Sequence, residues 1–130
     1  MQLRIANVQL RIMRENIVQI KSYAFAIKIV NTCKWLQTEK KEFVLSKQLL
    51  RSGTSVGANI EEAIGGQSRK DFFAKLTISY KEARETKYWI RLLTDTNYLT
   101  KEQSEPLLND IEELLRIIGS IQKTIRNSNS

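Results

Sequence analysis

The scarcity of helix-breaking residues is the feature that most constrains the fold of this chain. Only 5 Gly and 1 Pro occur in 130 residues, and turn-forming residues gather in three places, at 38–41, 65–68 and 94–100. Four long segments lie between these places, and long segments without clustered breakers are typical of α-helices. We therefore expect an all-α fold of four helices within a single domain.

The fourth segment carries the clearest helical pattern. Its apolar residues recur at steps of three or four, which places them on one side of a helix: Leu107, Ile111, Leu114, Ile118, Ile121 and Ile125. Thr100 and Gln103 have the spacing of a capping box, in which each side chain bonds to the backbone of the other residue. The pattern predicts a helix that begins just after Thr100.

The second segment, about 42–64, has Gly53 and Gly57 in its apolar seam. Each interior glycine costs a helix about 1 kcal/mol relative to alanine, so two on one face predict close approach by a neighbouring helix. A break in the helix near 52–55 is the alternative interpretation. Gly65 and Gly66 are expected to end this helix.

The first and third segments, about 15–37 and 69–95, each carry two apolar stripes. In the first segment, Ile20, Tyr23 and Ile27 share one side of a helix, and the second stripe lies on another side. A monomeric bundle would leave the second stripes in water, and such strips usually mark an interface. We predict that the chain forms a homo-oligomer through the second stripes, whose residues are Val18, Phe25, Ile29, Leu36, Ile78, Trp89 and Leu92. A splayed bundle or a wide core face is the alternative.

The two ends of the chain lack this pattern. The tetrapeptide QLRI stands at 2–5 and again at 9–12, with apolar and polar residues partly alternating. We expect an N-terminal appendage at 1–13, which is an added strand, a short helix or a poorly ordered segment. The four-helix domain is expected at 14–126, and a frayed tail at 127–130.

Several classes of protein are excluded by what the chain lacks. Histidine is absent, which removes the commonest general base and the commonest metal ligand. The single Cys33 cannot form an internal disulfide or a thiolate zinc site, and it is expected to be a small buried residue. No stretch approaches 18 apolar residues, and the first residues lack the pattern of a signal peptide. We expect no metal, no cofactor, no enzymatic activity, no membrane contact and a cytoplasmic location.

Positive charge gathers on the third segment. The chain has 21 Lys and Arg against 14 Asp and Glu, a net charge of +7 that favours anionic partners. Six basic residues fall within about a third of the helix circumference: Arg69, Lys70, Lys81, Arg84, Lys87 and Arg91. Three acids, Asp71, Glu82 and Glu85, lie to one side and would neutralise part of this strip by pairing within the helix. No base-reading motif accompanies it, so nucleic-acid binding would depend on phosphates and shape.

A polar stripe follows the second segment. Its four members stand at steps of 4, 4 and 3 and therefore share a narrow arc: Arg51, Ser55, Asn59 and Glu62. Side chains at these steps can form a hydrogen-bonded ladder that would fix the helix register or a subunit contact. A solvated face is the alternative.

The runs at 46–76 and 79–99 resemble the bacterial four-helix bundle family encoded within 23S rRNA intervening sequences, also called the S23 family. The polar stripe matches the family's arginine and its Ser-x-x-x-Asn-Ile-x-Glu pattern, 68–70 matches its basic turn, and Glu85 and 97–99 match as well. Relatives include the accessory variability protein of diversity-generating retroelements. The resemblance covers about 14–126 and implies an antiparallel up-down bundle, a ring-shaped homopentamer and a basic surface that engages nucleic acid.

Three functional hypotheses follow. The first is a non-enzymatic, oligomeric bundle that binds structured RNA or another nucleic acid, such as an RNA–DNA intermediate, through phosphate contacts at the basic strip. The second is a protein-interaction scaffold or accessory subunit, for example of a reverse transcriptase, that does not touch nucleic acid. The third, a nuclease, would need metal-binding acids that converge in a cleft, and the sequence favours it least.

Overall fold

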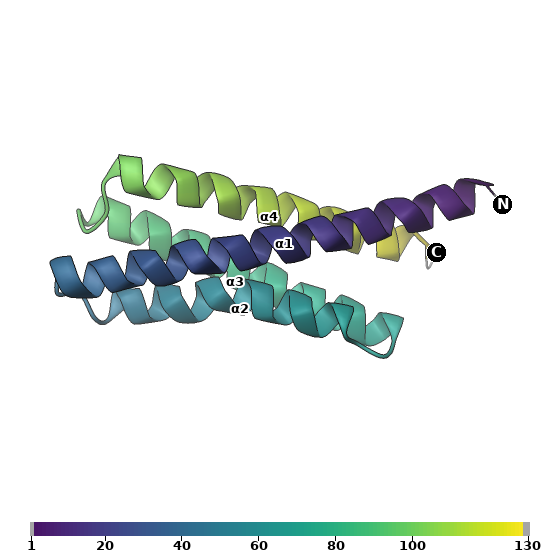
Figure 1. Cartoon of the computed structure of the whole chain (residues 1–130), viewed down its shortest axis with the longest axis horizontal. Helices are drawn as coiled ribbons and strands as arrows, with labels where there is room; N and C mark the ends of the chain where they lie inside the picture. Colours follow the sequence, from purple (N-terminus) through teal and green to yellow (C-terminus); the bar gives the residue numbers. More distant parts are fainter. Residues whose placement is uncertain (1, 129–130) are drawn as a thin grey trace.

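Four helices make up the described part of the chain, residues 2–128 of the computed structural model. α1 spans Gln2–Glu39, α2 Leu45–Ile64, α3 Arg69–Asp95 and α4 Lys101–Ser128. Consecutive helices run in opposite directions, and α1 also packs against α4, so the four helices enclose one core (Figure 1). The expected all-α fold is confirmed, and its topology is that of an antiparallel four-helix bundle.

The α4 seam lies in this core as the sequence predicts. All six of its apolar residues are buried, and Ile111 and Ile118 are fully so. The capping box is also present, because the Gln103 N–H donates to Thr100 Oγ1 at 3.2 Å and the Thr100 N–H donates to Gln103 Oε1 at 2.9 Å. The start of α4 is therefore determined by local hydrogen bonds, and its orientation by burial of the seam.

Two glycines bring α2 against α1. A Cβ atom built on Gly53 would lie 2.8 Å from Ile29 Cγ2, and one built on Gly57 would lie 3.3 Å from the backbone oxygen of Ser22. α2 runs without a break through both positions, so the prediction of close approach is confirmed and the alternative break near 52–55 is not found.

The apolar stripes of α1 are reversed relative to our prediction. The four α1 residues assigned to an oligomer interface are at most 1% exposed because they form the α1 side of the core: Val18, Phe25, Ile29 and Leu36. That assignment was wrong. The opposite stripe faces outward instead, with Ile20 70% exposed and Tyr23 67% exposed. On α3, Ile78 is exposed, whereas Trp89 and Leu92 are half-buried, so their role in an interface stays a prediction.

α1 begins earlier than the sequence pattern indicates. The helix continues without interruption from Gln2, so the expectation that the first helical segment begins at about residue 15 was wrong. No Gly or Pro interrupts 2–39, and extending an existing helix by a residue costs far less than starting one. The extension projects past the end of the other helices (Figure 1). At the other terminus α4 continues through Ser128, and the rest of the predicted tail, 129–130, lies outside the described residues.

A buried carboxylate begins α2. Glu42 accepts hydrogen bonds from the backbone N–H groups of Val44, Leu45 and Ser46 at 3.2, 3.0 and 2.7 Å. Burial alone would raise the pKa of Glu42, but these three bonds outweigh it and hold the pKa below its ordinary value. The side chain thus satisfies backbone donors that a helix start leaves unpaired.

Candidate nucleic-acid interface

A shallow groove of about 430 Å³ runs between α3 and α4. Three cations and two tyrosines of α3 line it together with one leucine of α4: Tyr80, Arg84, Lys87, Tyr88, Arg91 and Leu115. Lys87 Nζ lies 3.0 Å from Glu112 Oε1, which ties this lysine to α4. Among the described residues, no carboxylate lies within ion-pair distance of Arg84 or Arg91. Two guanidinium groups in the groove therefore remain available to an anion.

The acids of α3 do not neutralise this groove. Glu82 Oε2 lies 3.1 Å from Arg51 Nη1 of α2, and the other guanidinium end of Arg51 pairs with Glu85. Glu85 also accepts a hydrogen bond from Trp89 Nε1 at 2.9 Å. Glu82 and Glu85 are therefore held on the α2 side of the helix, and the pairing that we expected within the basic strip does not form.

The other three predicted basic residues lie away from this groove. Arg69 and Lys70 line a second hollow, of about 400 Å³, near the N-terminus of α3. There the Arg126 guanidinium of α4 lies 5.6 Å from the centroid of the Phe73 ring. Lys81 is exposed and lines neither hollow. The structure thus brings Arg84, Lys87 and Arg91 together in the groove. Arg69, Lys70 and Lys81 lie elsewhere along α3.

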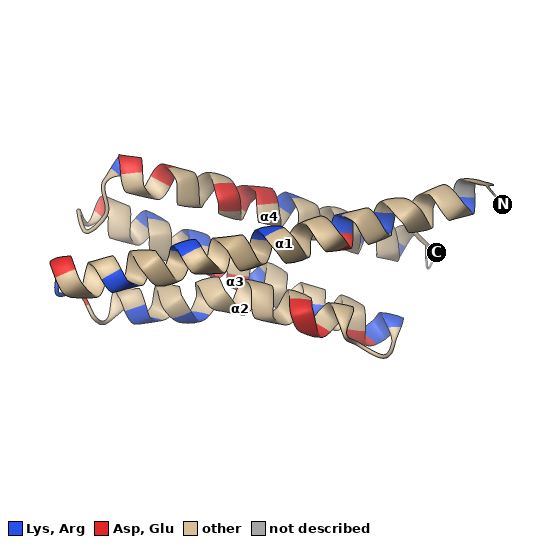
Figure 2. Cartoon of the chain, viewed as in Figure 1, with Lys and Arg blue, Asp and Glu red and all other residues tan. Residues whose placement is uncertain are grey.

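Charge is also divided along α4. Its acids gather in the N-terminal half, which begins at Lys101, and its remaining basic residues lie in the C-terminal half, from Arg116 onward (Figure 2). Because α3 and α4 are antiparallel, the basic half of α4 lies beside the start of α3. The end of the bundle that holds the two chain termini is therefore rich in arginine and lysine.

Sequence reasoning missed the tyrosines of the groove. Tyr88 is 54% exposed, and its ring contacts Trp89 edge-on with centroids 5.0 Å apart. The groove thus presents an exposed aromatic ring beside two guanidinium groups that lack an ion-pair partner among the described residues. A signal was present, since Tyr80, Arg84, Tyr88 and Arg91 stand at steps of 4, 4 and 3. Aromatic residues interleaved with cations suit stacking on nucleobases.

The polar stripe of α2 does not form the ladder of side chains that we considered. Ser55 Oγ donates to the backbone oxygen of Arg51 at 2.6 Å, and Asn59 Nδ2 donates to that of Ser55 at 2.8 Å. Glu62 pairs instead with Lys75 of α3 at 2.9 Å. The ends of the stripe, Arg51 and Glu62, therefore join α2 to α3.

Other candidate chemistry finds little support. Cys33 is buried, and its Sγ lies 3.3 Å from the backbone oxygen of Ser46. Burial, followed by the nearby carboxylate of Glu42, raises the pKa of the thiol to about 12, so it stays protonated at neutral pH. Among the described residues no cluster of three acidic or cysteine side chains could hold a metal ion. No helix among residues 2–128 has the length and hydropathy needed to cross a membrane.

Comparison with known proteins agrees with this architecture. Residues 14–120 match the family model described as 23S rRNA-intervening sequence protein. A solved structure from Bacteroides thetaiotaomicron, described as a protein with unknown function from the S23 ribosomal protein family, is 55% identical. The similarity covers 85% of this chain and 98% of that one, with a TM-score of 0.83. Among curated proteins none matches. The chain thus belongs to the 23S rRNA-intervening sequence protein family.

Proposed function

We propose that this protein binds nucleic acid through backbone phosphates in the α3–α4 groove, without catalysing a reaction. The observation that carries the proposal is the pair of guanidinium groups, Arg84 and Arg91, that share a groove with Tyr88 and have no described carboxylate within ion-pair distance. A guanidinium group can donate two parallel hydrogen bonds to two oxygens of one phosphate. Phosphate contacts supply most of the affinity in sequence-independent binding.

The tyrosines favour nucleic acid with unpaired bases. A ring that is 54% exposed presents a flat face on which any base can stack, whereas the bases of a duplex stack on one another. A hairpin RNA with a single-stranded loop is therefore a better probe than a plain duplex. The name of the 55% identical relative, which places it in a ribosomal protein family, is in keeping with an RNA partner.

The salt dependence of RNA binding tests this proposal. Each phosphate contact to a single strand contributes about 0.7 to the slope of log affinity against log salt, so Arg84→Ala with Arg91→Ala should lower the slope by about 1.4 per engaged subunit. Lys34→Ala with Lys47→Ala removes two exposed cations outside the groove and is the matched control. Tyr88→Ala should weaken loop binding with little change in slope. An Arg84/Arg91 variant that binds with the parental affinity and slope would refute the proposal.

A second function, protein interaction, is favoured by the outward stripe of α1. Ile17, Ile20, Tyr23 and Ile27 are 41%, 70%, 67% and 50% exposed, and all lie on the side of α1 away from the core. We propose that this stripe contacts another copy of the same chain. Light scattering tests it, because Ile20→Asp should dissociate the oligomer while leaving helicity unchanged. A parent protein that is monomeric at micromolar concentration would contradict this second function.

A further inference from the structure

The core-facing side of α1 is apolar from Val18 onward but basic and polar before it. Counting back from Val18 at steps of 4, 3, 4 and 3, the same face of the helix carries Arg14, Arg11, Asn7 and Arg4. The extension of α1 therefore turns arginines toward the bundle where the rest of the helix turns apolar side chains. Arg4 is exposed and Arg11 and Arg14 are half-buried, so this part of the face presents cations that a ligand can reach.

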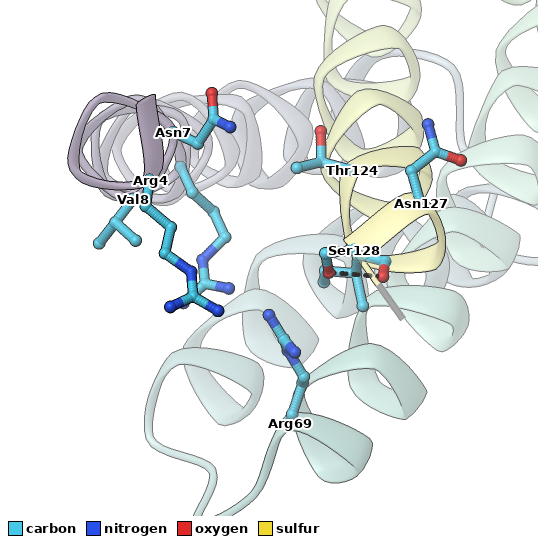
Figure 3. A pocket seen from close by; sticks show the side chains of 9 residues that line it. Arg4, Asn7, Val8, Arg69, Thr124, Asn127 and Ser128 are labelled. Carbon is cyan, nitrogen blue, oxygen red and sulfur yellow. Dashed lines mark hydrogen bonds between the residues drawn. The ribbon is translucent and has the colours of Figure 1, made fainter. Parts of the chain in front are cut away.

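These arginines meet a cavity of about 530 Å³ between α1, the start of α3 and the end of α4. It is lined by Arg4, Asn7, Val8, Arg11, Arg69, Thr124, Ile125, Asn127 and Ser128. Figure 3 shows the side chains of Arg4 and Arg69 reaching toward each other across the cavity, with the α4 residues forming the other wall. Three of the lining residues are arginines, and none of those described is an acid.

One donor beside the cavity, on Arg11, is incompletely satisfied. Arg11 Nε is a buried nitrogen that lacks a hydrogen-bond partner within the described structure, and the Glu15 carboxylate near it is 3.5 Å away. Arg14 Nη1 donates to Thr124 Oγ1 at 3.3 Å, which places a fourth guanidinium at the wall. Buried donors are normally hydrogen-bonded, so a donor held only by this long ion pair leaves room for a closer acceptor from the cavity.

We propose that this cavity binds a phosphate group, carried at the end of a nucleic-acid strand or free in solution. A tetrahedral phosphate offers several oxygens and up to two negative charges, which suits guanidinium forks arriving from α1 and α3. α3 also begins beside the cavity, and the positive end of its helix dipole adds to the attraction. The volume lies within the range of small-ligand sites. This site is separate from the α3–α4 groove and does not depend on it.

Titration with inorganic phosphate, by calorimetry at constant ionic strength in sodium chloride, is the direct test. We expect binding to the parent protein and at least a tenfold loss of affinity in Arg4→Ala with Arg11→Ala, since each charged hydrogen bond lost costs about tenfold. Lys34→Ala with Lys47→Ala, which removes two exposed cations outside both the cavity and the groove, should bind phosphate as the parent does. No phosphate binding by the parent, or equal binding by the Arg4/Arg11 variant, would overturn the proposal.

A substitution that continues the apolar seam separates binding from folding. Arg11→Leu should stay close to the parent in melting temperature, because the ion pair with Glu15 that it removes is partly exposed and contributes little, yet it should lose the stabilisation by added phosphate. A fall in melting temperature without any effect of phosphate on either protein would mean that Arg11 is a structural residue, and the proposal would fail.

The source of the phosphate is resolved with two RNAs of one sequence, bearing a 5′-phosphate or a 5′-hydroxyl. Tighter binding of the phosphorylated strand, abolished in the Arg4/Arg11 variant, supports a strand end as the ligand. Equal binding of both strands, with inorganic phosphate still captured by the cavity, supports free phosphate. The Arg84/Arg91 variant should bind both strands more weakly than the parent, by the same factor. The experiment therefore distinguishes a failure of the groove proposal from a failure of the cavity proposal.

Discussion

Gly53→Ala measures how closely α1 and α2 pack. A Cβ atom at this position would lie 2.8 and 2.9 Å from two γ-carbons of Ile29 and 3.3 Å from its Cβ. Ile29 is fully buried, and its branched side chain cannot turn away within a helix without entering a disfavoured rotamer. The added methyl group must therefore push the two helices apart or distort Ile29.

Two opposing contributions determine the magnitude. Alanine stabilises a helix interior by about 1 kcal/mol relative to glycine, whereas overpacking a core typically costs about 1–3 kcal/mol. Gly119→Ala is the matched control, because a Cβ there would lie 3.6 Å from Tyr80 Cε2, an ordinary contact. The helix contribution is common to both substitutions, so the free energies of unfolding of the two variants should differ by about 1–3 kcal/mol, with Gly53→Ala the less stable.

Urea denaturation at one protein concentration provides the measurement. Ile29→Ala removes both crowded γ-carbons, so adding Gly53→Ala to that variant should cost nothing or stabilise it, and the double-mutant cycle should show a favourable coupling. Our reasoning is refuted if Gly53→Ala stabilises the protein as much as Gly119→Ala does, since the helices would then not be in close contact.

Three further predictions concern the cap of α2, the thiol and the extension of α1. Glu42→Gln should lower the free energy of unfolding by about 1 kcal/mol at pH 7, because its carboxylate bonds are charge-assisted. The folded-state pKa of Glu42 is lowered, so this contribution is present above pH 4.5 and should vanish as the pH falls through the folded-state pKa, which urea unfolding at pH 7 and pH 3 would reveal. Cys33 should resist thiol reagents at pH 8 until the protein unfolds; rapid labelling of the native protein would contradict its burial. Deleting residues 1–13 should leave cooperative thermal unfolding by circular dichroism intact, because nearly all of those described are exposed, but should abolish phosphate binding; loss of cooperativity would show that they belong to the core.

Features that depend on neighbours along the chain could be predicted from the sequence. The capping box of Thr100 and Gln103 and the seam of α4 are patterns within one helix, and both occur as expected. Gly53 and Gly57 indicated a close helix contact, because only close packing compensates for two glycines on one helix face. The family resemblance and the fold followed from such patterns.

The candidate sites required the arrangement of helices in space. The basic strip on α3 was predicted from the sequence. That Glu82 and Glu85 do not pair with it depends on Arg51, which binds both acids from another helix. The role of Glu42 as a cap was likewise hidden, since its carboxylate acts only where the chain turns between α1 and α2. Such contacts join residues of different segments, and the number of residues between them follows no helical repeat.

The sequence by itself determined that this chain forms four amphipathic helices, that α1 is apolar on two sides and that the third helix is basic. Periodicity places residues on the faces of a helix, but it does not say which face turns inward. Only the tertiary structure decided that Phe25 lies in the core and Ile20 on the surface, because that choice depends on the shape of the opposing helices. Where Gly53 leaves room on α2, Ile29 fits against it, and this packing fixes the rotation of α1 along its whole length, from the buried seam to the arginines of its first turns.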